Sequence, residues 1–104
     1  MKKPFVSDEK IHEIASQYPT PFYLYDEAGI EKTDALVKQA FAWNPGYREY
    51  FAVKATPNPY ILKIMQDLGN GLDCSSYTEL LMAKRLGFTG HDIMFSSNVT
   101  PMKE

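Results

Sequence analysis

Lys54 is the residue of this sequence whose setting most clearly suggests chemistry. It directly follows an apolar run at residues 50–53, at the end of a predicted strand. Apolar neighbours desolvate a lysine and favour its neutral, nucleophilic amine, which is the form that Schiff-base chemistry needs. The alternative, which spacing alone favours, is a strand-end lysine whose stem covers apolar surface while its ammonium stays in water.

Two acidic residues are candidates to act beside this lysine. Asp73 ends the next predicted strand, where its carboxylate can stabilise a positive charge or take part in proton transfer, or simply form a turn. Ser76 and Glu79 have the S-x-x-E spacing of a capping box, so Glu79 is expected to cap a helix even if it also faces the site.

Other reactive groups lack a partner in the sequence. Cys74 has no second cysteine and no well-placed histidine near it, so a small buried core residue is predicted. The scarcity of His and Cys predicts no zinc site, and the carboxylates form no metal-binding loop. The Gly69-Asn70-Gly71 stretch precedes a strand and lacks the third glycine of a dinucleotide loop. Ser96 lacks the glycines of a hydrolase elbow.

An alternation of strands and helices is expected to position these residues. Strands are predicted over residues 22–25, 49–54, 71–74 and 92–95, and helices over 9–15, 28–42, from 59 to the stop at Gly69, and after Ser76 to the stop at Gly87. Alternation of this kind implies parallel strands, whose carboxyl ends meet at one edge. Lys54, Asp73 and the polar residues 96–98 are therefore expected to converge.

The composition indicates an ordinary globular protein. The chain has 104 residues, 44% of them hydrophobic, and a net charge of -2. Scattered Lys and Arg form no basic stripe, so no nucleic-acid partner is predicted. One cysteine and the absence of a long apolar run predict no disulfide, signal peptide or membrane span, and hence a cytoplasmic location.

Several linked motifs resemble one enzyme family. FAVKATPNP at residues 51–59, GLDCSSYTEL at 71–80 and IMFSSN at 93–98 resemble pyridoxal-phosphate (PLP)-dependent decarboxylases with the alanine-racemase-like barrel. TPFYLYDE at residues 20–27 is similar to diaminopimelate decarboxylases in particular. The resemblance runs in collinear order from about residue 20 to residue 98.

The resemblance implies a fold and a set of site residues. The fold class is α/β, the amino-terminal part of a PLP-binding TIM-like (β/α)8 barrel, with residues 1–27 as an arm and residues 28–104 as the incomplete barrel. The strand at 22–25 is expected to join a β-sandwich domain in the full protein. Lys54 would hold PLP through an imine, and Asp73 and Glu79 match acidic positions near the cofactor in similar enzymes.

The activity implied by the resemblance is decarboxylation of meso-diaminopimelate to L-lysine, by a homodimer that takes a small amino-acid substrate. Tyr77-Thr78, where many diaminopimelate decarboxylases have two glycines, and Thr100, where relatives often have lysine, depart from that pattern. They leave open an ornithine, arginine or carboxynorspermidine decarboxylase. A non-catalytic PLP-binding protein and a small open α/β domain with Lys54 at its edge are further alternatives. An eight-stranded barrel needs about 250 residues, so this segment alone is not expected to be active.

Overall fold

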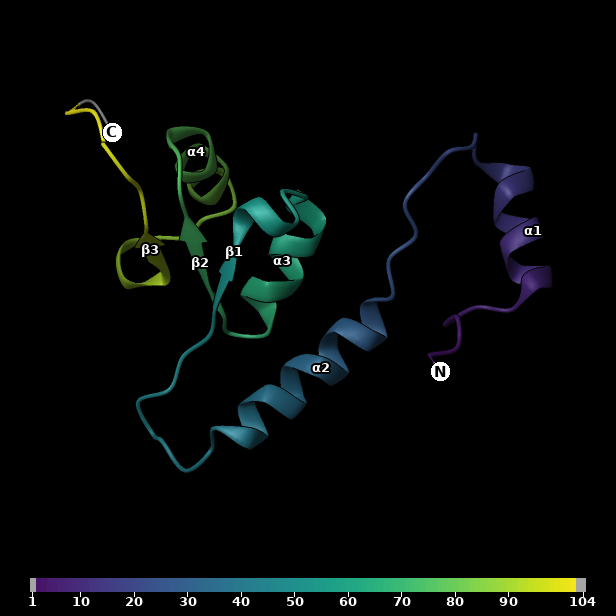
Figure 1. Ribbon diagram of the computed structural model, residues 1–104, viewed down its shortest axis with the longest axis horizontal. Coiled ribbons are helices and arrows are strands. Elements are labelled where there is room, and N and C mark those ends of the chain that lie inside the picture. The colour runs from purple at the N-terminus through teal and green to yellow at the C-terminus, as the bar shows by residue number, and fades with distance from the viewer. Residues whose placement is uncertain (1, 103–104) are drawn as a thin grey trace.

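The computed structural model describes residues 2–102 of the chain (Figure 1). Its elements, in order, are α1 (Asp8–Gln17), α2 (Glu27–Ala40), β1 (Tyr50–Ala52), the 3-10 turn η1 (Val53–Ala55), α3 (Pro59–Asp67), β2 (Gly71–Cys74), α4 (Tyr77–Arg85), the 3-10 turn η2 (Gly90–Asp92) and β3 (Ile93–Phe95). In these residues no helix is both long and apolar enough to cross a lipid bilayer.

The three strands form one parallel sheet in the order β1-β2-β3. Both pairings are parallel, and the arrows of β1 and β2 point the same way in Figure 1, so the three carboxyl ends share one edge. Ala52 lies opposite Asp73, and Asp73 lies opposite Met94. The predicted parallel α/β arrangement is confirmed.

Side-chain caps explain where the helices begin. Asp26 accepts a hydrogen bond from the Gly29 N–H at 3.0 Å and starts α2. Asn58 accepts one from the Tyr60 N–H at 3.0 Å, with Pro59 in the first helical position, which has no need of an N–H donor. These caps satisfy backbone donors that the helix itself leaves free.

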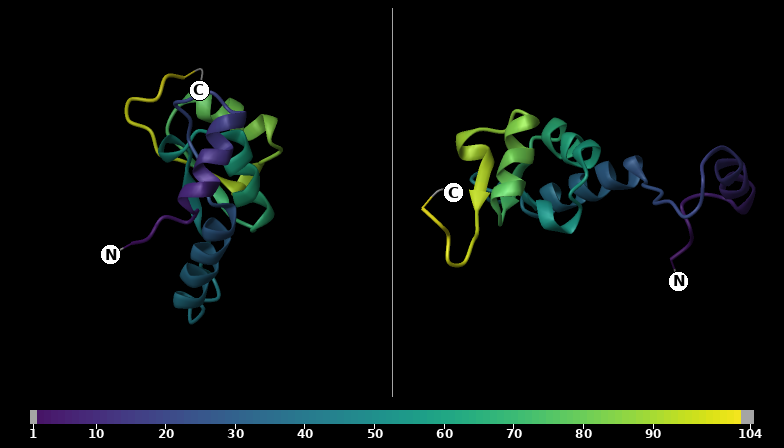
Figure 2. Two further views of the ribbon diagram at one scale, coloured as in Figure 1. Left: turned by 90° about the vertical axis from the view of Figure 1, so that its right-hand side faces the viewer. Right: turned by 90° about the horizontal axis from the view of Figure 1, so that it is seen from above.

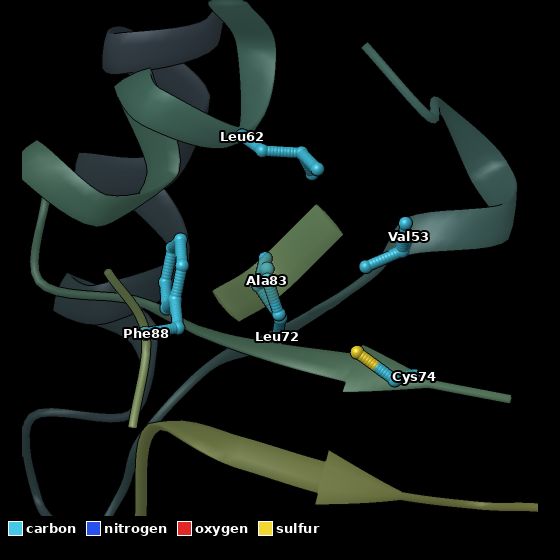
Figure 3. Close-up of a cluster of buried hydrophobic side chains, with 6 residues drawn as sticks. All are labelled: Val53, Leu62, Leu72, Cys74, Ala83 and Phe88. Atoms are coloured by element: carbon cyan, nitrogen blue, oxygen red, sulfur yellow. The ribbon is translucent and has the colours of Figure 1, made fainter. Parts of the chain in front are cut away.

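The core lies between the sheet and the helices α3 and α4. It is formed by fully or almost fully buried apolar side chains that converge in Figure 3: Val53, Leu62, Leu72, Cys74, Ala83 and Phe88. Leu72 and Cys74 therefore face the helices, and Asp73 between them faces the other side of the sheet, because side chains alternate along a strand. The predicted core position of Cys74 is confirmed.

The amino-terminal arm lies apart from this core. Helix α1 begins at the cap Ser7, but it has no buried residues and lies away from the sheet in Figure 1 and in the right-hand view of Figure 2. The strand predicted at residues 22–25 is wrong for this structure, which has no regular secondary structure there. A strand needs a neighbour for its backbone hydrogen bonds, and no described segment pairs with these residues.

Side chains also tie the amino ends of β1 and β3 together. Arg48 donates hydrogen bonds to the Asp92 carboxylate at 2.7 Å and to the His91 carbonyl at 3.1 Å. The bond from Arg48 lowers the pKa of Asp92 below its ordinary value. The Tyr50 hydroxyl donates to the same His91 carbonyl at 2.6 Å. Side-chain hydrogen bonds therefore link β1 and β3 at this end of the sheet.

Candidate functional site

Lys54 lies just beyond the carboxyl end of β1. The sequence predicts a strand through Lys54, but β1 ends at Ala52, and Lys54 is the middle residue of η1. The turn is closed by a hydrogen bond from the Thr56 N–H to the Val53 carbonyl at 3.2 Å. Val53 takes the buried position and Lys54 is exposed, so the expected burial of the lysine is not present in the described residues.

Asp73 lies on the sheet face opposite the core, next to the strand that leads to Lys54. Its neighbour Ala52 in β1 is two residues before Lys54. The Asp73 Oδ1 atom is buried and has no hydrogen-bond partner within the described part of the chain. Buried polar atoms are almost always paired, so this oxygen indicates a missing partner.

Glu79 helps to cap the start of α4, as predicted, but one of its hydrogen bonds differs from that of a capping box. The Glu79 N–H donates to the Ser76 Oγ at 3.3 Å, which is the expected half of a capping box. The Glu79 Oε2 accepts from the Ser75 N–H at 3.1 Å and from the Ser76 hydroxyl at 2.7 Å, and not from the Ser76 N–H. The second oxygen, Oε1, is buried without a partner in residues 2–102.

The thiol of Cys74, at the end of β2, is affected by the charges of both carboxylates. Burial above all, and then the negative charges of Glu79 and Asp73, raise the pKa of the Cys74 thiol from its ordinary 9.0 to about 11. A thiol in this state is not a nucleophile at neutral pH. The reactive groups at this edge are therefore the Lys54 amine and the two carboxylates.

A hollow of about 750 Å³ adjoins η1. It is lined by two tyrosines of the arm and by the loop after Lys54: Tyr23, Tyr25 and residues 55–60. Polar residues after β3 reach the same edge of the sheet, because the Ser96 N–H donates to the Cys74 carbonyl at 2.9 Å. Lys54, Asp73 and Ser96 thus end or follow three neighbouring strands at one edge of the sheet.

The arrangement suits a ligand that offers a carbonyl group and hydrogen-bond donors or positive charge. An exposed amine can form a Schiff base with a carbonyl. Two carboxylate oxygens without partners can accept hydrogen bonds or offset a cation. Among residues 2–102, no group of three or more His, Cys, Asp and Glu side chains is placed to hold a metal ion.

Two site neighbours were missed in the sequence. Ala52 and Met94 share the Asp73 face of the sheet, at the same level across the three strands. Strand alternation could have predicted the face of each residue, but their register across strands far apart in sequence depends on the folded sheet.

Comparisons with known proteins agree with this arrangement. Residues 27–104 match the family model for the pyridoxal binding domain of pyridoxal-dependent decarboxylases. Protein TabA of Pseudomonas amygdali pv. tabaci is 51% identical over 90% of this chain and 22% of its own length. A diaminopimelate decarboxylase of Bacteroides thetaiotaomicron is 40% identical over 74% of the chain and 20% of its own length. The chain thus spans about a fifth of the length of these relatives.

Among solved structures, the chain is similar to an ornithine decarboxylase from Entamoeba histolytica. It superposes with a TM-score of 0.79 at 33% identity, covering 92% of this chain and 30% of its own. The likeness confirms the predicted fold class, the amino-terminal part of a decarboxylase barrel.

Proposed function

Since the chain belongs to the pyridoxal-dependent decarboxylases through their pyridoxal binding domain, we propose that it is the amino-terminal part of an enzyme that decarboxylates an amino acid, with Lys54 as the residue that holds the cofactor. The cofactor of the family is pyridoxal phosphate. The observation that carries the proposal is the position of Lys54, an exposed amine in η1 next to the strand end that holds Asp73.

The side chains at this edge have separate proposed roles. When bound, pyridoxal phosphate supplies the electron sink for the pair left by the departing carboxylate. Lys54 binds the cofactor through its Nζ and can hold or move a proton at that atom. Asp73 and Glu79 accept hydrogen bonds with the oxygens that the described residues leave without a partner. Their negative charges also favour positive charge nearby.

For the substrate, we propose meso-diaminopimelate, with L-lysine as the product, in lysine biosynthesis. Diaminopimelate decarboxylases recur among the relatives, at 40% identity for the Bacteroides thetaiotaomicron protein and 38% for that of Helicobacter pylori. The complete enzyme is proposed to be a cytoplasmic homodimer. Residues 28–104 are proposed as its first barrel portion, and residues 1–27 as its amino-terminal arm.

A second candidate substrate is another basic amino acid such as ornithine. The ornithine decarboxylase structure superposes over 92% of the chain, and Tyr77-Thr78 replaces the two glycines common in diaminopimelate decarboxylases. Both candidates require the same cofactor site, so they differ only in the groups that contact the far end of the substrate. A panel of diaminopimelate, ornithine, arginine and carboxynorspermidine, with released carbon dioxide as the readout, separates them.

The cofactor site is tested on the longest natural polypeptide that contains this sequence. The protein is incubated with PLP, reduced with borohydride and digested, and the labelled peptide is mapped by mass spectrometry. We expect the label on Lys54. Lys63 is the matched control, because it is an exposed lysine on α3 that pairs with Asp67 at 2.8 Å away from the site. A folded protein with no label on Lys54, or with equal labelling of Lys63, contradicts the proposal.

A further inference from the structure

We infer that Met94 forms part of the surface on which the aromatic ring of the bound cofactor rests. The inference depends on the proposed function, because it assumes that Lys54 holds pyridoxal phosphate. It starts from the register of the sheet, in which Ala52, Asp73 and Met94 are direct neighbours across β1, β2 and β3.

These three residues share the face of the sheet that does not contact α3 and α4. Their neighbours along the chain pack on the core: Phe51 in β1, Val53 at the start of η1, Leu72 and Cys74 in β2, and Ile93 in β3. Side chains alternate along a strand, so the residues between or next to these point to the opposite face. Met94 keeps 52% of its surface exposed there, as expected of an apolar side chain without a covering element in the described chain.

The amino end of this face is already filled. Tyr50 is the register partner of Gly71, and a Cβ atom on Gly71 would come within 2.6 Å of the Tyr50 ring. The ring therefore lies across Gly71, and its hydroxyl is fixed on the His91 carbonyl. Lys54 follows Ala52 by two residues, so we expect a ligand attached at Lys54 to lie at the next level towards the carboxyl edge, which is the level of Ala52, Asp73 and Met94.

Side-chain chemistry distinguishes Met94 within this level. Ala52 is small and leaves room above β1, whereas Asp73 offers a charge and hydrogen bonds. Met94 supplies a flexible, polarisable thioether, and sulfur makes favourable contacts with aromatic rings. Met94 is therefore the apolar contact of this level for a planar ring, and Asp73 is its polar contact.

The experiment measures methionine oxidation by dilute hydrogen peroxide in the longest natural polypeptide, with and without bound PLP, by mass spectrometry. If the ring covers Met94, PLP should slow conversion to the sulfoxide at least about 5-fold, because oxidation requires access to the sulfur. Met82, which packs against the core from α4, and Met102, which is fully exposed, are internal references with no expected change. An unchanged rate at Met94, no oxidation of Met94 in either form, or equal protection of all three methionines overturns the inference.

Two variants test the same contact by affinity. Replacing the side chain in Met94→Ala should weaken PLP binding about 2- to 10-fold, the range expected from a lost sulfur–aromatic contact. Met94→Leu keeps the apolar volume and should show a smaller change. Borohydride labelling of Lys54 in the same samples separates the two proposals. Labelling of Lys54 without protection of Met94 refutes only this inference, whereas absence of labelling refutes the proposed function itself.

Discussion

Ala52 and Asp73 lie directly opposite each other in the parallel register of β1 and β2, so the turn that carries Lys54 leaves the sheet beside the strand that carries Asp73. The two residues are 21 positions apart in the sequence, with all of α3 between them. Their pairing brings Asp73 and the turn that carries Lys54 to the same edge of the sheet, where parallel α/β folds bind ligands.

The first prediction concerns the amine of Lys54. Lys54→Arg keeps the positive charge but removes the usable amine, because a guanidinium does not lose its proton in proteins. We expect no borohydride-stable cofactor and a fall in carbon dioxide release of at least about 100-fold, the lower end for loss of a proton-transfer group. Lys63→Arg serves as the control and should leave both unchanged. Cofactor labelling at full yield in the Lys54→Arg protein would contradict the assignment.

The second prediction separates the two roles of Glu79. In Glu79→Gln the remaining oxygen can still accept from the Ser75 N–H and the Ser76 hydroxyl, while the charge is lost. We expect an unchanged free energy of unfolding and a raised dissociation constant for PLP. Cofactor absorbance measures the binding. Glu79→Ala should in addition lower stability by about 1 kcal/mol, as for a lost helix cap. If the Gln variant binds PLP like the original protein, Glu79 has only its capping role.

The third prediction follows from the buried thiol of Cys74. With a pKa of about 11, roughly one thiol in a thousand is ionised at pH 8, so iodoacetamide should label Cys74 only after unfolding. The unfolded thiol ionises from about pH 9.0, before the folded one does, so ionisation of Cys74 should reduce stability as pH rises from 9 towards 11. Alkylation kinetics with and without urea measure the first effect. Rapid native labelling at pH 8 would show that the thiol is accessible.

The fourth prediction tests the core that supports the site. Leu62 is completely buried, so Leu62→Ala should destabilise the protein by about 2–5 kcal/mol through lost burial and a residual cavity. Leu36 on α2 is 55% exposed, and Leu36→Ala should cost well below half of that. Denaturant unfolding of the longest natural polypeptide compares them. Equal losses from both variants would mean that the buried cluster is not the main support of the sheet.

Local signals in the sequence were sufficient for most of the elements. Ser76 begins a helix where the S-x-x-E spacing predicts a cap, because a cap depends on only a few consecutive residues. The strand at residues 22–25 was wrong for the opposite reason. Its apolar and aromatic residues suit a strand, but a strand forms only with a partner, and the described chain provides none.

The sequence by itself determined the alternation of helices and strands, the caps, and the lysine, aspartate and glutamate that the motifs single out. Only the tertiary structure decided that Val53 is buried while Lys54 is exposed, and that Met94 shares a face with Asp73. The physical reason is how far apart in the sequence the interacting residues are. Caps and turns depend on neighbours within one turn of chain, whereas burial, register and shared faces depend on contacts between segments that only the folded sheet brings together.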